Sequence, residues 1–211
     1  MTNQIKVAVV GASGKSGKYL TEELLRRKFN VRALVRVPEK QGLTGDLLEV
    51  VTGNVLDYGS VLNLLQGCQA VISTLGQRKG EPPVFAAATG NILKAMGELE
   101  IRRYILLTGM SLDVPGDRKK FINRFLSWMM RTAFTEVLKD KQEEYALLPD
   151  SRADWTVVRV PMIVPEDITG TCRTSLVDCQ GKRIGTRDLA GFLCDQLLDE
   201  SFIRKAPFLS N

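Results

Sequence analysis

The sequence predicts a doubly wound α/β fold, in which helices cover both faces of one parallel sheet. Short apolar segments typical of strands alternate with segments whose apolar residues recur at helical spacing. The first of these segments is apolar except for Lys6, as expected for a strand buried on both faces. The 211 residues contain no repeat, linker or low-complexity stretch, so we expect a single domain over residues 1–211.

Strand-like and helix-like segments alternate along most of the chain, which implies parallel strands joined by right-handed crossovers. Strands are predicted at residues 5–10, 31–35, 48–52, 70–74, 104–108 and 155–160, with short extended pieces near 173–177 and 183–184. Helices are predicted at 16–28, 60–65, 84–99, over much of 117–148, and at 187–198. In such folds ligands lie at the carboxyl ends of the strands, so the residues that follow each strand are the informative ones.

Composition excludes several classes of function. The net charge is +5, and the basic residues stand in short groups scattered along the chain, so we expect no nucleic-acid partner. A mild positive field would still attract a polyanionic ligand. No apolar run approaches the ~20 residues that span a bilayer, and the N-terminus enters a strand at once. We therefore expect no membrane association, no targeting segment and a cytoplasmic location.

The cysteines and the missing histidines limit the chemistry further. The four cysteines include no C-x-x-C pair, and the chain has no histidine. These features argue against a zinc site and against a disulfide framework, so no metal site is expected. They also exclude a Ser–His or Cys–His nucleophile pair.

A glycine-rich turn follows the first predicted strand, with the sequence Gly11-Ala-Ser-Gly14-Lys-Ser-Gly17. Gly11 suits a tight turn, Gly14 lets the backbone approach a diphosphate, and Gly17 lets the helix pack close to the strand. The amide groups at the start of the following helix favour a negatively charged group. The turn therefore predicts a dinucleotide site.

The second strand ends at Arg36, nineteen residues beyond Gly17. An NAD site usually carries an acidic residue near this position, which binds the ribose hydroxyls. An arginine can instead bind a 2′-phosphate, so NADP(H) is expected to be preferred over NAD(H). Lys15 could join the same phosphate cluster, and an exposed arginine without a ligand is the alternative for Arg36.

The remaining strand ends supply small, polar or apolar groups. Asn54 and Val55 follow the third strand and suit an adenine ring, and residues 73–78 follow the fourth. The fifth strand ends near Thr108 and Ser111, and the sixth near Val160–Met162, where the nicotinamide and substrate would lie.

Motifs along nearly the whole chain resemble one family. The segments GASGKSG, ALVR, GNVLD, VISTLG, LLTGMS, DWTVVRVPMI and TRDLAGFLCDQLLD are similar to the atypical short-chain dehydrogenases. Within them, the chain most resembles the NmrA-like NAD(P)-binding proteins related to biliverdin-IXβ reductase (flavin reductase).

The resemblance implies a Rossmann domain with a small C-terminal substrate region, and a set of residues that bind NADPH. It implies cofactor contacts from Gly11, Ser13, Gly14, Lys15, Ser16, Gly17, Arg36, Asn54, Val55, Leu75, Gly76, Arg78 and Thr108. It further implies that Ser111 and the turn Val160, Pro161 and Met162 face the reacting end.

The chain departs from the family where acid–base chemistry is usually carried. The tyrosines at 19, 58, 104 and 145 are followed four residues later by Glu23, Leu62, Thr108 and Pro149, so no Y-x-x-x-K pair exists. Met162 stands where the flavin-reductase relatives carry a histidine. Lys141 is the one lysine considered near the site, although an exposed helical lysine is the simpler interpretation.

Two functions are compatible with these residues. The first is an NADPH-dependent oxidoreductase that passes hydride to a flat aromatic acceptor, such as a flavin, quinone or tetrapyrrole-like molecule, with Ser111 and Lys141 as catalytic candidates. The second is a non-catalytic NADP(H)-binding sensor or regulator of the NmrA-like type. The apolar segment 121–134 could pack in the core, form a wall for a flat acceptor, or form a dimer face, so a monomer or weak homodimer is expected.

Overall fold

The computed structural model describes residues 5–37, 44–165 and 170–211. Within them, one sheet of eight strands has the order β3-β2-β1-β4-β5-β6-β10-β8, and it is parallel except for β8. The strands are β1 (Lys6–Val10), β2 (Asn30–Val35), β3 (Leu48–Thr52), β4 (Ala70–Ser73), β5 (Arg103–Gly109), β6 (Asp154–Val160), β8 (Arg173–Ser175) and β10 (Phe208–Ser210). The predicted doubly wound fold is confirmed.

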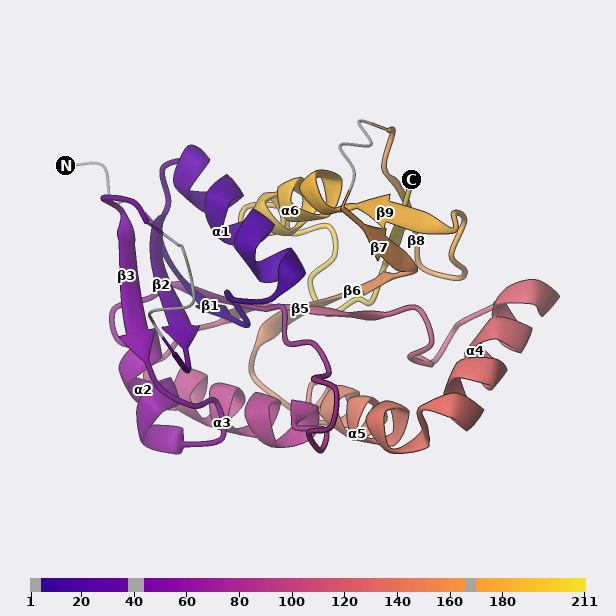
Figure 1. Cartoon of the computed structure of the whole chain (residues 1–211), viewed down its shortest axis with the longest axis horizontal. Coiled ribbons are helices and arrows are strands. Elements are labelled where there is room, and N and C mark those ends of the chain that lie inside the picture. The colour runs from indigo at the N-terminus through magenta and orange to yellow at the C-terminus, as the bar shows by residue number, and fades with distance from the viewer. Residues whose placement is uncertain (1–4, 38–43, 166–169) are drawn as a thin grey trace.

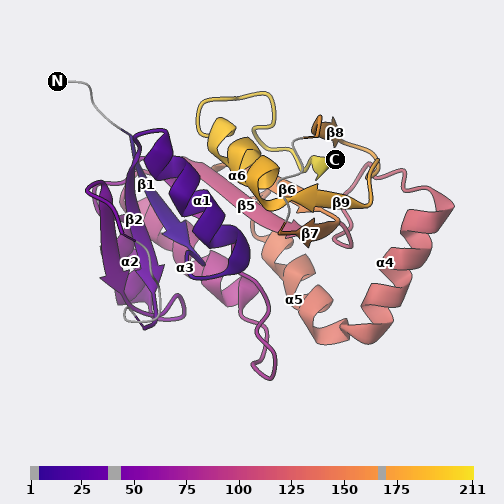
Figure 2. The same cartoon turned by 45° about the horizontal axis from the view of Figure 1, so that its top comes forward.

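Helices cover both faces of the sheet (Figure 1). On one face, α1 (Lys15–Arg26) packs against α6 (Thr186–Asp195), and Figure 2 shows the two helices side by side. On the other face lie α2 (Tyr58–Leu65), α3 (Phe85–Glu98) and α5 (Thr135–Ala146). Each face buries its own apolar cluster, since alternate residues of the strands point to opposite sides.

Two strands are absent from the prediction. β7 (Met162–Val164) pairs with β9 (Arg183–Gly185) in a small separate parallel sheet. β10 places the last residues of the chain beside β6, at Phe208 and Arg159. Both β7 and β10 have three residues, which is too short for an alternating pattern to be recognised.

The helical region predicted within 117–148 consists of two helices, α4 (Phe121–Ala133) and α5, which meet at Phe134. α4 projects from the body of the molecule (Figure 1). Within the described part of the chain, the one residue that α4 buries is Ser127, while Phe121 is 83% exposed and Trp128 is 55% exposed. The interpretation of segment 121–134 as core packing is therefore wrong.

Among the helices of the described residues, none combines the length and the apolar character that crossing a bilayer requires.

Candidate functional site

The turn between β1 and α1 depends on two of its three glycines for its shape. Gly11 has a φ of +84°, and a Cβ there would lie 2.8 Å from the carbonyl carbon of Thr74. A Cβ on Gly17 would lie 2.1 Å from the carbonyl oxygen of Gly11. At Gly14 a Cβ would meet the Gly11 oxygen at 3.3 Å, which is a tight contact but not a clash. The turn can therefore adopt this shape only without side chains at positions 11 and 17, whereas Gly14 is exposed.

The start of α1 suits an anion. Gly14 is its N-cap residue, no described side chain caps its amide groups, and its first turn contains no acidic residue. The first N–H groups of a helix lack intrahelical partners, and the helix dipole adds positive potential there. These groups can therefore donate hydrogen bonds to a diphosphate, as the sequence predicts.

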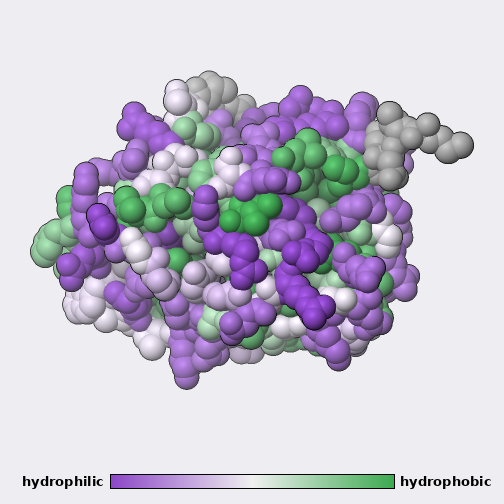
Figure 3. All heavy atoms as spheres, turned by 180° about the vertical axis from the view of Figure 1, so that it is seen from behind, coloured by the Kyte–Doolittle hydropathy of each residue, from purple (hydrophilic) through white to green (hydrophobic). Residues whose placement is uncertain are grey.

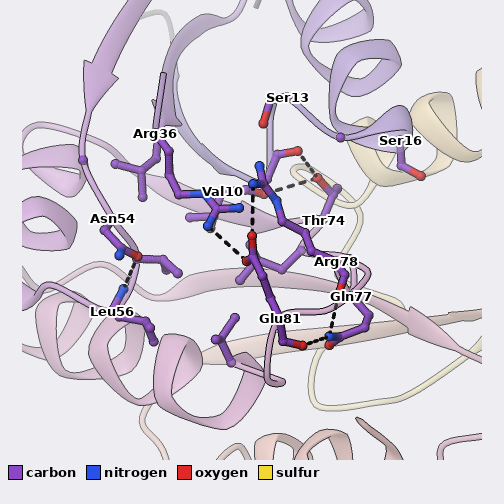
Figure 4. Close-up of a pocket in the computed structure, with 18 of the residues that line it drawn as sticks. Val10, Ser13, Ser16, Arg36, Asn54, Leu56, Thr74, Gln77, Arg78 and Glu81 are labelled. Atoms are coloured by element: carbon purple, nitrogen blue, oxygen red, sulfur yellow. Dashed lines mark hydrogen bonds and ion pairs between the residues drawn. The ribbon is translucent and has the colours of Figure 1, made fainter. Parts of the chain in front are cut away.

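A cavity of about 680 Å³ opens beside this turn, at the carboxyl ends of β1 to β4 (Figure 4). Its volume lies within the range of small-molecule sites. Eleven of the predicted cofactor residues line it: Gly11, Ser13, Gly14, Lys15, Ser16, Arg36, Asn54, Val55, Leu75, Gly76 and Arg78. The structure thus brings together, on one wall, residues that lie up to 67 positions apart in the sequence.

Within the cavity, Glu81 lies between two arginines (Figure 4). Its carboxylate is 3.1 Å from Nη1 of Arg36 and 3.5 Å from Nη1 of Arg78. Glu81 itself is held by a turn, in which Gln77 Nε2 donates to its carbonyl oxygen at 2.6 Å. Two guanidinium groups therefore converge on one anionic group, at the position where the sequence predicts a 2′-phosphate.

The end of the cavity near β3 combines apolar and amide groups. The side chain of Asn54 accepts a hydrogen bond from the backbone N–H of Leu56 at 3.1 Å. Val55 is only 8% exposed, and its carbonyl accepts from Asn91, whereas Leu56 is 46% exposed and lines the same wall. Leu56 is therefore the more available apolar contact for a flat ring.

Sequence reasoning missed several residues that line the cavity. They include Leu34, Leu56, Glu81, Pro82 and Val84. Leu34 and Leu56 each stand within two residues of a predicted contact, so proximity could have found them. No motif indicates that the loop carrying Glu81 folds back toward Arg36.

The other predicted residues lie outside this cavity. Gly17 is buried beneath the turn. Thr108 and Val160 lie next to each other, since Thr108 pairs with Arg159 and Gly109 with Val160 across β5 and β6. Ser111 is half-buried just after β5, and Pro161 and Met162 follow β6. These residues share the same edge of the sheet with the glycine turn, separated from it by β4.

Arg159 positions the loop that follows β5. It is 1% exposed, and its guanidinium donates to the carbonyl of Ala206, to the carbonyl of Leu112 and to Asp117 Oδ2 at 2.7 Å. The Phe208 ring lies under the guanidinium at 3.6 Å. This buried arginine ties together β6, the C-terminus and the loop containing Ser111, and so has a structural role that its place at a strand end did not reveal.

Lys141, on α5, is half-buried against the start of α3, so its interpretation as an exposed lysine is wrong. Its Nζ lies 3.7 Å from the centroid of the Phe85 ring, and Phe85 directly follows Val84 of the cavity wall. Burial lowers the pKa of Lys141, while the nearby carboxylate of Glu144 opposes that shift. Burial likewise raises the pKa of Glu144, which accepts a hydrogen bond from Thr89 at 2.8 Å. Lys141 therefore lies behind one wall of the cavity.

Residues 11–200 match a protein-family model described as NAD(P)H-binding. The match covers most of the chain and includes the glycine turn, both arginines and the ends of β5 and β6.

Known proteins of similar sequence or structure include reductases. The divinyl chlorophyllide a 8-vinyl-reductase of Arabidopsis thaliana is 26% identical over an alignment of 234 residues. The alignment covers 95% of this chain and 52% of that protein. The chain thus spans about half the length of this curated relative.

Two solved structures share the fold. A short-chain dehydrogenase/reductase from Veillonella parvula, in complex with NADP, has a TM-score of 0.81 at 15% identity and covers 98% of this chain and 94% of that chain. The anaerobillin reductase ChuY from Escherichia coli O157:H7 has a TM-score of 0.80 at 20% identity and covers 97% and 96%. At these identities the two structures are evidence for the fold alone.

Proposed function

The chain belongs to the NAD(P)H-binding family, and from this premise we propose that it is an NADPH-dependent reductase with a flat aromatic acceptor. The observation that carries the proposal is the convergence of Arg36 and Arg78 on the Glu81 carboxylate, within the cavity that the glycine turn also lines. Arginine binds phosphate through its planar fork of N–H donors, and two arginines suit the doubly charged 2′-phosphate that distinguishes NADP from NAD.

The residues of the cavity and of the neighbouring strand ends would together hold such a cofactor. The amide groups at the start of α1 would hold the diphosphate, and Leu56 and Asn54 would contact the adenine. The ends of β5 and β6 would hold the nicotinamide, near Thr108, Ser111 and Val160. When bound, NADPH would supply the hydride.

The chain itself would mainly bind and orient. Ser111 would hydrogen-bond the nicotinamide or the acceptor through its hydroxyl, and the tether at Arg159 would keep the Ser111 loop in place. An acceptor such as a flavin or quinone takes its proton from water, so the site needs no strong acid. This suits a chain without histidine and without a Y-x-x-x-K pair.

The acceptor class also draws on the relatives. One is named as a reductase of divinyl chlorophyllide and another as an anaerobillin reductase. We therefore infer that a tetrapyrrole-like molecule belongs among the first acceptors to test, beside flavins and quinones.

A non-catalytic NADP(H) sensor is the second candidate. Lys141 is the one charged group considered for catalysis. Its ammonium group lies over the Phe85 ring and interacts with the carboxylate of Glu144, behind the cavity wall. This arrangement favours a protein that binds the cofactor without turnover.

The two functions separate in one experiment. NADPH and NADH binding is measured by calorimetry, and NADPH oxidation is then followed with a flavin, a quinone and a linear tetrapyrrole. The reductase predicts steady oxidation with at least one acceptor. Tight NADPH binding without any oxidation would support the sensor function and contradict the reductase function. Failure to bind NADPH would contradict both functions.

A further inference from the structure

The helix α4 is oriented in the reverse of the usual way, with its polar side toward the protein and its apolar side toward solvent. Asn123 donates hydrogen bonds to Asp178 Oδ1 at 2.8 Å and to the carbonyl of Cys179 at 2.9 Å. Ser127 is 1% exposed, and Arg131 pairs with Asp113. These contacts fix the polar side against the body of the molecule.

The outer side of α4 is apolar along its whole length. Its exposed residues are Phe121, Ile122, Phe125, Leu126, Trp128, Met129 and Met130, each between 43% and 83% exposed. Leu176 and Val177 are each 45% exposed. They lie near the start of α4, because the N–H of Arg118 donates a hydrogen bond to the carbonyl of Val177, and they add to the apolar surface. Hydrophobic residues are visible at the outer edge of the molecule that α4 occupies (Figure 3). An exposed apolar surface of this kind marks an interaction site.

Basic residues border the same surface. Residues 118–135 contain five basic residues and no acidic residue, an excess equal to the net charge of the whole chain. Lys119 and Arg131 pair with Asp113, whereas Arg118, Lys120 and Arg124 are exposed beside the apolar side of the helix. Three exposed basic residues therefore border the apolar surface, while Asp113 offsets the charge of the other two.

We propose that α4 docks the protein onto an anionic lipid surface, with the helix lying in the interface. An interfacial helix combines a bulky apolar side containing Trp and Phe with basic residues that contact anionic headgroups. Phe121, Phe125 and Trp128 also line an open hollow of about 690 Å³ between α4 and residues 113–119, whereas Ile122, Leu126, Met129 and Met130 do not. Such a projecting helix fits a deformable lipid layer better than a rigid partner. Pairing with a second copy would bring two sets of positive charge together, which is unfavourable. This proposal departs from the sequence-based expectation of no membrane association.

The chain offers an intrinsic probe for this docking. It contains two tryptophans, and Trp155 is 4% exposed whereas Trp128 is 55% exposed. Only Trp128 can change its environment strongly when α4 enters lipid. A shift of tryptophan emission to shorter wavelength would therefore report on α4.

The test uses the full chain with vesicles of phosphatidylcholine, alone or mixed with phosphatidylglycerol. We expect co-sedimentation and a blue shift with the anionic vesicles, about tenfold weaker binding to the neutral ones, and weaker binding at high salt. Ile122→Ser with Phe125→Ser should reduce binding by about tenfold or more, and Lys120→Ala with Arg124→Ala should reduce binding to anionic vesicles alone. Leu198→Ser is the matched control, because Leu198 is 71% exposed and lies just after α6; it should bind like the wild type.

Two outcomes would overturn the proposal. Absence of binding to anionic vesicles is the first. The second is a dimer, detected by sedimentation equilibrium, that Ile122→Ser with Phe125→Ser dissociates; it would identify a second copy as the occupant. Because α4 contributes no residue to the cavity of the proposed reductase, NADPH affinity without lipid should be unchanged in these variants. The docking can therefore fail or succeed independently of that function.

Discussion

The carboxyl edge of the sheet has two halves that differ in how their sites are built. At β1 to β4, a glycine turn, a helix N-terminus and two arginines line one cavity. At β5 and β6, the strand ends carry Thr108, Ser111 and Val160, and the basic and acidic groups nearby belong to structural tethers such as Arg159 with Asp117. A site for phosphates needs donors in fixed geometry, whereas a site for a flat acceptor needs mainly space and a rigid frame. Substitutions in the first half should therefore have larger effects.

The largest effect is expected from Gly14→Val. A Cβ at Gly14 meets nothing closer than 3.3 Å, so the fold should tolerate the change, but a branched side chain would occupy the place of the diphosphate. NADPH affinity should fall by about a hundredfold or more, measured by calorimetry on a protein with wild-type circular dichroism.

Gly17→Val is the contrasting variant. Its Cβ would lie 2.1 Å from the carbonyl oxygen of Gly11, so it should destabilise the turn itself and lower the melting temperature. Wild-type NADPH affinity in a folded Gly14→Val protein would show that the diphosphate does not lie at this turn.

Arg36→Ala should have the next largest effect. A charge-assisted hydrogen bond contributes roughly 1.5–3 kcal/mol, or about one to two decades of affinity. NADPH should bind more weakly by that factor, while NADH affinity should stay nearly unchanged, since NADH lacks the 2′-phosphate. Equal losses for both cofactors in parallel titrations would mean that Arg36 has a structural role.

The same contrast explains what the sequence could predict. The alternation of strands and helices predicted the class and all six strands from β1 to β6, because buried parallel strands are mostly apolar. The glycine turn and Arg36 were recognisable because phosphate binding constrains residue type and spacing together. Acceptor binding constrains neither, so Ser111 and Lys141 rested on position alone.

α4 shows a different limit. Its periodicity correctly indicates an amphipathic helix, but a pattern does not state which side faces the protein. The usual assumption turns the apolar side inward, and here Asn123 and Ser127 turn it outward. Likewise, the fold of the loop that carries Glu81 depends on tertiary contacts with Arg36 that no local pattern encodes.

Ser111→Ala tests the second half of the site, and its effect should be modest. If Ser111 orients the nicotinamide or acceptor without donating a proton, its loss should reduce kcat/KM by about tenfold or less, the value of one neutral hydrogen bond. The rate should also vary little between pH 6 and 8.

A thousandfold loss on Ser111→Ala would instead identify a proton donor. The dependence of the rate on pH tests whether Lys141 is a proton donor. Burial lowers its pKa, so if Lys141 donated the proton, the rate would fall as pH rises through that lowered value.

The smallest effect is expected at Glu81, and its sign is informative. The carboxylate forms exposed ion pairs with Arg36 and Arg78, so it competes with a 2′-phosphate for both arginines. Exposed ion pairs contribute at most about 1 kcal/mol each, so Glu81→Gln should tighten NADPH binding by roughly threefold to tenfold and leave NADH unchanged. Glu22→Gln, at an exposed position of α1, controls for the change in net charge. The gain should shrink at high salt, because screening weakens the competing pairs. Weaker NADPH binding by Glu81→Gln would mean that the carboxylate holds the arginines in place for the phosphate, and the two halves of the site would then be alike in depending on tethers.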